Sequence, residues 1–234
     1  IEQLTKKEEL LQQYKKGVMQ KIFNQEIRFH PKGTSSQAHG DADDGSELRT
    51  GFIKDFGKFY YGKSAPKSSI TDDAKTPCVR YGELYSTYGE NIKEIHSYTN
   101  IDPKNLKFSK GGEVLVPRVG EDPLDFANCS YLPFPDVAIG EMISVFNTQE
   151  NGLYLTYYFN TMLKKKFASY VEGSTPANLY FRYLENIEIS IPPIEEQNKV
   201  VEFLSSIDTK IEQVQNQLEQ AKEFKKALLQ QMFV

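Results

Sequence analysis

The sequence predicts an α+β fold, in which a mixed, mostly-β domain is flanked by long helices at the two ends of the chain. After Pro193 there is no glycine or proline as far as Val234. By contrast, 13 of the 14 tyrosines lie between positions 60 and 183, and 14 of the 15 glycines lie between positions 33 and 173. Aromatic residues separated by glycine turns favour short strands, whereas a long segment rich in Glu, Gln, Lys and Leu favours a helix.

The middle of the chain contains apolar runs of strand length. Such runs predict one strand within 111–118, two within 136–147 ("DVAIG" and "EMISVFN") and one within 186–190, the last with alternating isoleucines. Segment 152–167 differs, because Leu155, Phe159, Met162, Leu163 and Phe167 follow helical spacing and predict an amphipathic helix. Segment 30–48 has almost no large apolar residue and is interpreted as a linker or surface loop. These patterns divide the chain into 1–30, 31–192 and 193–234.

The C-terminal segment has the signals of a long helix. Pro193 suits a first helical position, and Glu195 and Glu196 suit the positive end of the helix dipole. Ser205 and Ser206 before Asp208 suggest a bend or a restart. Beyond them the apolar residues step by three and four, which predicts a coiled-coil seam of Ile207, Ile211, Val214, Leu218 and Ala221, continued by Phe224 and Leu228.

The two ends of the chain resemble each other. A shift of 210 residues places residues 1–24 on 211–234 with 8 identities and no gap, among them Lys15-Lys16 on Lys225-Lys226. A true repeat is one explanation, and the general similarity of amphipathic helices is the other. If the end helices pack together, their connection through the central domain makes them antiparallel. The expected helix-pairing residues are Leu4, Leu11, Val18, Val214, Leu218, Ala221 and Leu228.

The length of the first helical segment is also informative. A 24-residue helix is about 36 Å long, which is close to one turn of B-DNA. An antiparallel pair of such helices with a reading domain at each end would place the two domains about one turn apart on a duplex.

Composition excludes several classes of protein. No apolar run is long enough for a membrane span, and no secretory signal opens the sequence. Two cysteines are too few for a disulfide framework, and they favour a reducing, cytoplasmic location. Three scattered histidines give no metal-ligand spacing, so we expect no metal site. The net charge of −4 does not exclude nucleic acid, because binding depends on a local face.

Several stretches resemble the DNA-specificity subunit of type I restriction–modification enzymes. "IPPIEEQNKVVEFLSSID" and the helix after it are similar to a conserved region of that family, and "LLQQYKKGVMQKIFNQEIRF" is similar to the end of the preceding conserved region. The stretches "GKSAPKSS", "CVRYGELY" and "YVEGSTPANLYFRYLENIEISIPP" resemble pieces of its target recognition domains.

The resemblance implies a function and a set of partners. One target recognition domain would read one half of a split site in double-stranded DNA, and the subunit would be non-catalytic. It would recruit modification subunits, which bind S-adenosylmethionine and methylate adenine, and through them the restriction and motor subunit. This chain has one such domain instead of two. It is therefore either an excised half, which the missing initial Met favours, or a half-subunit that associates with itself through the coiled coil.

The residues themselves argue against catalysis. An adenine methyltransferase needs Asn or Asp before its Pro-Pro pair, whereas Ile191 stands before Pro192-Pro193 here. The lone glycine turn at 109–112 is too weak a signal for a cofactor loop. We therefore expect no catalytic residue, metal or cofactor in this chain.

Recognition of DNA needs phosphate contacts that set the register and base contacts that read the sequence. The candidates lie in small polar loops, where solvated surface charge is the alternative explanation; Arg80, for example, could pair with Glu83 instead. The candidate set is Tyr61, Lys63, Ser64, Lys67, Arg80, Tyr81, Tyr85, Lys110, Arg118, Lys165, Ser174, Thr175 and Asn178. The alternative function is a coiled-coil interaction module whose β domain binds protein or carbohydrate.

Overall fold

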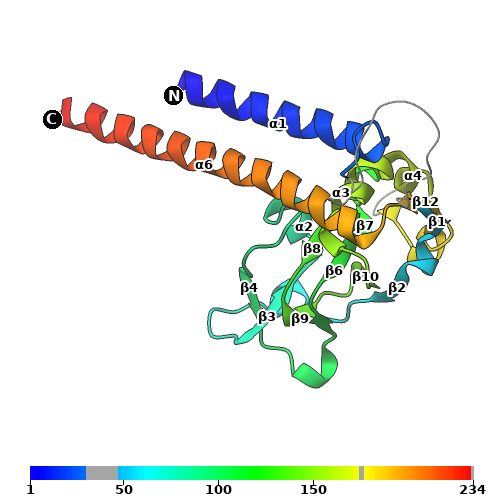
Figure 1. The fold of residues 1–234 in the computed structure, drawn as a ribbon. Helices are drawn as coiled ribbons and strands as arrows, with labels where there is room; N and C mark the ends of the chain where they lie inside the picture. Colours follow the sequence, from blue (N-terminus) through cyan, green and yellow to red (C-terminus); the bar gives the residue numbers. More distant parts are fainter. Residues whose placement is uncertain (30–46, 174–176, 233–234) are drawn as a thin grey trace, which may run out of the picture. The chain divides into compact units, whose positions relative to one another are not determined.

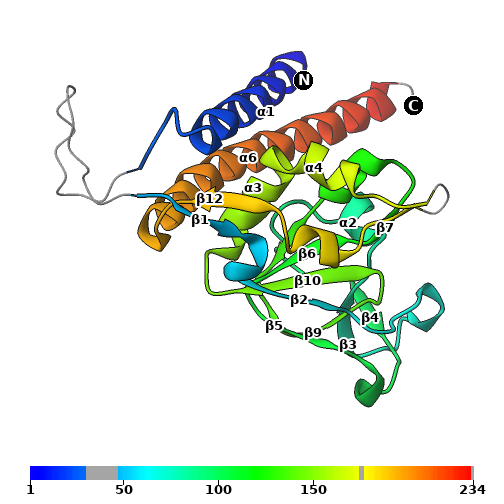
Figure 2. The ribbon, with the colours of Figure 1, turned by 90° about the vertical axis from the view of Figure 1, so that its right-hand side faces the viewer.

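The computed structural model describes residues 1–29, 47–173 and 177–232. The chain forms two compact units, of which unit 1 contains Ile1–Phe29 and Asn198–Val234, and unit 2 contains His30–Gln197. Figures 1 and 2 colour both units along the sequence. Almost all of the predicted linker at 30–48 lies outside the described residues.

Unit 1 is a pair of antiparallel helices. Helix α1 (Glu2–Phe23) lies beside α6 (Ile194–Met232), with the start of α1 next to the C-terminal part of α6 (Figures 1 and 2). Gln215 Nε2 donates to Glu8 Oε1 at 2.8 Å, and Lys15 Nζ lies 2.7 Å from Asp208 Oδ1. Residue numbers rise along one helix as they fall along the other, so the predicted antiparallel pairing is confirmed.

The apolar seam follows the expected spacing over most of its length. On α6, the buried residues include Ile207, Ile211, Val214 and Leu218; on α1, Val18 is buried, and Leu4, Leu11 and Ala221 are half-buried. The seam stops before its predicted end. Phe224 is 66% exposed and Leu228 is 43% exposed, so the last predicted positions of α6 are not covered by α1.

Two details of the predicted C-terminal helix are wrong. Helix α6 runs without a break through Ser205 and Ser206, because Ser206 Oγ donates to the Phe203 carbonyl at 2.7 Å instead of capping a new helix. Serine hydroxyls inside a helix commonly return a hydrogen bond to an earlier carbonyl in this way. The helix also begins at Ile194, one residue later than predicted, and the Pro193 carbonyl accepts the Glu196 N–H at 3.0 Å.

The first large sheet of unit 2 is antiparallel and four-stranded, in the order β2-β10-β6-β8. The strands predicted within 111–118 and 141–147 are its two central strands, and the continuous burial of the first explains its unbroken apolar run. The strands are β2 (Gly57–Tyr61), β6 (Glu113–Pro117), β8 (Ser130–Leu132) and β10 (Ile143–Thr148).

The second large sheet is mixed, in the order β4-β3-β9-β5. Strands β3 and β9 are parallel, and the other pairs are antiparallel. Strand β9 confirms the strand predicted from "DVAIG". The strands are β3 (Thr76–Val79), β4 (Ser97–Thr99), β5 (Phe108–Lys110) and β9 (Pro135–Ile139).

Two small pairs and several short helical turns complete unit 2. Strand β1 (Arg49–Phe52) pairs with β12 (Glu188–Ile191), which confirms the strand predicted from alternating isoleucines. Strand β7 (Val119–Gly120) pairs with β11 (Ala177–Asn178). The short helices are α2 (Glu83–Ser86), α5 (Phe181–Leu184), η1 (Ile53–Asp55), η2 (Lys67–Ser69), η3 (Pro103–Asn105) and η4 (Pro123–Ala127).

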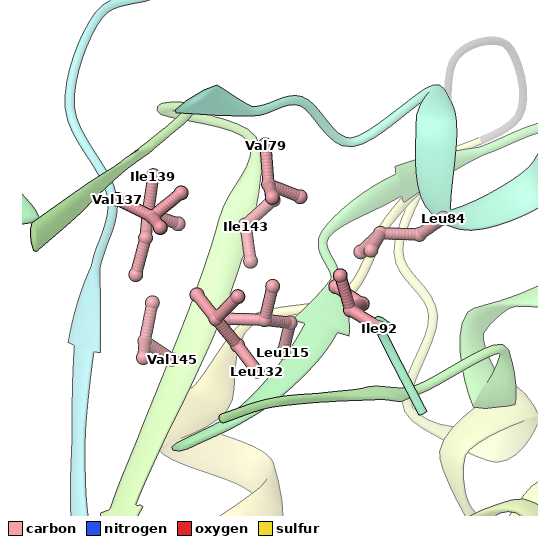
Figure 3. Packing of buried hydrophobic residues seen from close by; sticks show 9 residues of the cluster. All are labelled: Val79, Leu84, Ile92, Leu115, Leu132, Val137, Ile139, Ile143 and Val145. Carbon is pink, nitrogen blue, oxygen red and sulfur yellow. The ribbon is translucent and has the colours of Figure 1, made fainter. Parts of the chain in front are cut away.

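The main core cluster of unit 2 joins the two large sheets. Figure 3 shows its side chains converging from β6, β8 and β10 of one sheet and from β3 and β9 of the other. Tyr60 packs against this cluster, whereas its neighbour Tyr61 contacts Phe181 of α5. Because successive strand residues point to opposite faces, Tyr60 and Tyr61 lie on opposite faces of β2. The cluster consists of Val79, Leu84, Ile92, Leu115, Leu132, Val137, Ile139, Ile143 and Val145.

The helix predicted at 152–167 is interrupted and is not amphipathic. It forms α3 (Gly152–Met162) and α4 (Lys164–Ser169), which are separated at Leu163. Every residue from Gly152 to Phe159 is buried, whereas Met162, which was expected on the apolar face, is 37% exposed. Tyrosines at 154, 157 and 158 fill the positions expected to face water, and aromatic packing such as Phe146 on Phe159 covers the apolar side.

The start of α6 is fixed within unit 2 by a buried amide. Gln197 is 0% exposed; its Nε2 donates to Glu150 Oε2 at 2.8 Å and to the Pro192 carbonyl at 2.9 Å. Its Oε1 accepts the Asn151 N–H at 3.0 Å, and Arg49 also binds Glu150. These contacts join β1, the end of β12 and the start of α3 to the first turn of α6.

Candidate nucleic-acid interface

The turn at residues 140–142, between β9 and β10, brings several predicted DNA-binding residues together. The segment after β2 runs along this turn. Lys63 donates its N–H to the Ile139 carbonyl at 2.8 Å, and the Ser64 carbonyl accepts the Glu141 N–H at 3.2 Å. The predicted residues Lys63 and Ser64 are therefore held against the turn by the main chain.

The close approach of these two segments depends on glycine. A Cβ atom on Gly62 would lie 2.1 Å from the Gly140 carbonyl oxygen, a distance that no side chain tolerates. Directly after it, Ser64 and Ala65 have φ values of 62° and 57°, which place two non-glycine residues in the left-handed region. Such backbone strain persists only where the surroundings enforce it, and it concentrates at functional sites.

Arg80 lies beside the same turn. The Gly140 N–H donates to the Val79 carbonyl at 2.9 Å, and a Cβ on Gly140 would lie 3.4 Å from the Arg80 Cα. Glu83 binds Arg80 through the main chain and not through the guanidinium, because Glu83 Oε2 accepts the Arg80 N–H at 2.7 Å. The other oxygen of Glu83 accepts the Ser97 hydroxyl. Among the described residues, no ion pair engages the Arg80 guanidinium.

Arg118 reaches the turn from the other side. Its N–H donates to the Met142 carbonyl at 3.0 Å, and its own carbonyl accepts the Leu179 N–H at 2.9 Å. Asn178 pairs with Val119 in the β7–β11 ladder, directly beside it. Two predicted residues that are distant in the sequence, Arg118 and Asn178, are thus neighbours in the fold.

The side chains around Arg118 form an arginine–tyrosine cluster, which we define as Tyr61, Arg118, Tyr180, Arg182 and Tyr183. The Arg118 guanidinium carbon lies 4.7 Å from the Tyr61 ring centre and 5.8 Å from that of Tyr180. Arg182 lies 4.8 Å from the rings of both Tyr180 and Tyr183. Burial raises the pKa of Tyr61, although the two arginines oppose this effect. Cation–π contacts of this kind hold guanidinium groups in fixed planes.

The Tyr85 hydroxyl is used for a hydrogen bond within unit 2 and positions a neighbouring strand. Its Oη donates to the Val119 carbonyl at 3.0 Å, which joins the segment after Arg80 to strand β7. Burial raises the pKa of Tyr85, so the phenol keeps its proton, and hence its hydrogen bond, at neutral pH. The hydroxyl predicted to contact DNA is therefore engaged within unit 2.

Lys110 does not join the residues of the 140–142 turn. It lines a separate hollow with Lys58, Tyr60 and Lys107, which we call the lysine hollow. Tyr60 there donates to the buried Glu113 at 3.2 Å, and Lys107 lies 5.2 Å from the Tyr60 ring. Since Tyr60 and Tyr61 point to opposite faces of β2, the lysine hollow and the arginine–tyrosine cluster are on different faces of the sheet.

The remaining candidates are less closely placed. Lys67 is exposed in η2, Tyr81 is exposed in the segment after Arg80, and Lys165 is exposed on α4. Ser174 and Thr175 lie outside the described residues. Arg182 and Tyr180 were not in the predicted set. Their signal is visible in "YFRY" at 180–183, where aromatic residues alternate with an arginine directly after a polar loop.

The described residues offer little for metal or thiol chemistry. They contain no group of three or more histidine, cysteine, aspartate or glutamate side chains that could hold a metal ion. Cys78 and Cys129 are buried free thiols, and burial raises the pKa of Cys78 to about 12. In the described parts of the chain, no helix combines the length and apolar character that a membrane crossing requires.

Unit 2 is thus an irregular β domain in which arginines, tyrosines and small polar residues meet near one turn, and unit 1 is a pair of helices. These features define the class of a polar recognition module that carries a paired-helix unit. Comparison with known proteins makes the class specific. Residues 46–223 match the family described as the type I restriction modification DNA specificity domain. Because the match covers most of the chain, the protein belongs to this family.

Relatives and solved structures agree with this assignment. A Methanocaldococcus jannaschii protein named as the MjaX type I restriction enzyme specificity subunit is 26% identical over 228 residues, which are 97% of this chain and 51% of the relative. The HsdS subunit of Thermoanaerobacter tengcongensis superimposes with a TM-score of 0.57 at 15% identity, over 92% of this chain and 47% of that one. A chain from a structural study of complex assembly in the type I R-M system gives the same TM-score at 18% identity, over 97% and 53%. The chain thus spans about half the length of these proteins, whose fold it shares.

Proposed function

We propose that this protein recognises a specific sequence in double-stranded DNA as part of a type I restriction–modification system, and that unit 2 reads one half of a bipartite site. The observation that carries the proposal is the family match together with the residues held at the 140–142 turn. Lys63, Ser64, Arg80, Arg118 and Asn178 come from four separate segments, yet their main chains meet at or beside this turn.

The chemistry of this group suits a duplex. Lysines such as Lys63 and the nearby Lys67 provide point charges for phosphate oxygens, which position a protein on DNA without reading its sequence. Arg80, Arg118 and Asn178 carry the side-chain types that form paired hydrogen bonds with base edges in the major groove. The two arginines have no carboxylate partner among the described residues, so their donors are available to an external acceptor.

Unit 1 has a different part in the proposal. Its antiparallel helices act as a spacer of fixed register and, by resemblance to the family, as the docking element for modification subunits. The chemistry belongs to those partners: the modification subunit binds S-adenosylmethionine, and the restriction and motor subunit joins through it. This chain provides recognition and no catalytic residue. Self-association through the coiled coil belongs to the same proposal.

The alternative is a coiled-coil module whose β domain binds protein or carbohydrate. The family match favours DNA over this alternative. The residues at the 140–142 turn also favour DNA, because a carbohydrate site does not require several lysine and arginine side chains that lack ion-pair partners.

The test compares charge reversal at the turn with charge reversal elsewhere. Lys63→Glu combined with Arg80→Glu is placed in the protein assembled with its modification subunits. Lys104→Glu, an exposed residue of η3, is the matched control. We expect site-specific methylation to fall by at least about tenfold in the double variant, since each good base contact contributes about 1–3 kcal/mol. The control and the co-purification of the subunits should not change.

Two results would contradict the proposal. The first is an unsubstituted complex that selects no sequence from a pool of random duplexes and whose duplex binding does not weaken with salt. The second is an exchange of residues 51–190 for those of another family member that leaves the recognised sequence unaltered. Unchanged methylation in the double variant, with sequence selection retained, would instead move the reading surface to the lysine hollow.

A further inference from the structure

Arg118 has an unusually constrained environment in unit 2. Its main chain is hydrogen-bonded on both sides, to Met142 and to Leu179. Its guanidinium carbon lies within cation–π distance of the rings of Tyr61 and Tyr180, and Tyr61 contacts Phe181 with ring centres 4.4 Å apart. The main-chain hydrogen bonds and the ring contacts therefore restrict the side chain before any ligand arrives, which reduces the entropy lost on binding.

The guanidinium of Arg118 has no hydrogen-bond or ion-pair partner among the described residues. Its Nε is buried and has no hydrogen-bond partner, and within the described residues no carboxylate pairs with its guanidinium. Arg182 in the same cluster is different, because its Nη2 lies 3.0 Å from Tyr183 Oη and 3.5 Å from Glu172. Since Nε is enclosed, the two Nη groups are the donors that Arg118 can offer to a ligand, side by side in one plane.

We propose that Arg118 is a specificity-determining residue that reads guanine, with its two Nη groups donating to O6 and N7 in the major groove. This inference rests on the proposed function. Guanine is the base that presents two acceptors on its major-groove edge, and a planar arginine fork matches them. A phosphate contact requires no fixed plane.

The experiment uses the protein assembled with modification subunits and a pool of random duplexes, with the base preference at each position as the readout. Arg118→Lys keeps the charge but loses the fork. We expect the preference for guanine at one position of this half-site to fall by roughly 5- to 150-fold, the equivalent of about 1–3 kcal/mol, while preferences at other positions stay. Arg49→Lys is the matched control, because the Arg49 fork is paired with Glu150 outside the arginine–tyrosine cluster, and it should leave every base preference unchanged.

A second variant covers the case in which Arg118→Lys does not fold. Tyr180→Leu keeps the guanidinium but removes one of the rings that hold it, so we expect a smaller loss at the same guanine. Helical circular dichroism checks the folding of each variant.

Several outcomes would overturn the inference. The first is a half-site without guanine, and the second is a uniform loss of binding with preferences intact. The third is an unchanged preference in folded Arg118→Lys or in Tyr180→Leu, and the fourth is the same loss in Arg49→Lys. These differ from failure of the proposed function, in which the unsubstituted complex selects no sequence at all.

Discussion

The two units hold their cations in different ways. In unit 1, Lys15 lies 2.7 Å from Asp208, and the two side chains are only 13% and 27% exposed. In unit 2, the guanidinium of Arg118 lies near the rings of Tyr61 and Tyr180 and has no carboxylate partner among the described residues. A paired charge fixes the register of the helices, whereas an unpaired charge held in place remains available to an external acceptor. This contrast agrees with the proposed function, in which unit 1 sets geometry and unit 2 provides recognition.

The largest expected effect tests the geometric part of this contrast. Ile207 is 3% exposed in the seam of α6, and Ile207→Ala should lower the free energy of unfolding by about 2–5 kcal/mol, because it leaves a cavity. Urea unfolding followed by circular dichroism measures it. Phe224→Ala is the control and should change stability by less than about 0.5 kcal/mol, since Phe224 is 66% exposed. Equal losses in the two variants would mean that the covered and uncovered parts of the seam do not differ.

A second prediction concerns the close approach at the 140–142 turn. Gly62→Ala places a Cβ about where the Gly140 carbonyl lies, so backbone must move, and we expect a loss of about 1–3 kcal/mol in unfolding free energy. Sequence-specific binding to DNA should also fall, because Lys63 and Ser64 follow Gly62 directly in the sequence. Gly82→Ala is the matched control, since its Cβ would meet nothing within 4 Å. Full stability and full specificity in Gly62→Ala would separate the 61–64 segment from the reading surface.

The same contrast explains how much of the fold could be predicted. The helical seam followed from a three-and-four spacing that α6 keeps from Ile207 to Leu218, and the antiparallel direction followed from the connection of the two helices through the central domain. The strands with continuous or alternating apolar residues were equally evident. A helix does form within 152–167, but its amphipathic character was wrongly predicted, because the first two turns are buried on all sides. Sequence patterns predict helices and strands in which buried and exposed positions alternate regularly. They fail where irregular tertiary packing determines which residues are buried.

The site was predicted only as separate residues. Tyr61, Arg80 and Arg118 were identifiable by type, but nothing local in the sequence shows that one turn brings their main chains together. Tyr85 was assigned to DNA contact as a member of a small polar loop, whereas its hydroxyl donates to the Val119 carbonyl. Lys110 was grouped with the others, yet the alternation of β2 separates the lysine hollow from the arginine–tyrosine cluster.

A third prediction tests the positioning part of Tyr85. Tyr85→Phe removes the donor to Val119 and should lower the free energy of unfolding by about 0.5–1.5 kcal/mol. Because β7 follows Arg118, we also expect weaker sequence-specific binding, without a change in which bases are preferred. Tyr98→Phe is the control, since Tyr98 is 42% exposed and is not among the candidate DNA-binding residues. An altered base preference in Tyr85→Phe would instead show that this phenol reads DNA directly.

The smallest effect isolates the paired charge of unit 1. A double-mutant cycle of Lys15→Met and Asp208→Asn should give a coupling energy of about 0.5–1 kcal/mol, near the upper end for exposed pairs, because both side chains are largely covered. The pair Lys6–Glu9, at 3.6 Å and with side chains 66% and 54% exposed, is the control and should couple by no more than about 0.3 kcal/mol. Raising the salt concentration should weaken the control pair proportionally more, since solvent ions reach it freely. Equal coupling in the two pairs would mean that Lys15 is ordinary surface charge, and the register of α1 on α6 would then depend on its apolar seam alone.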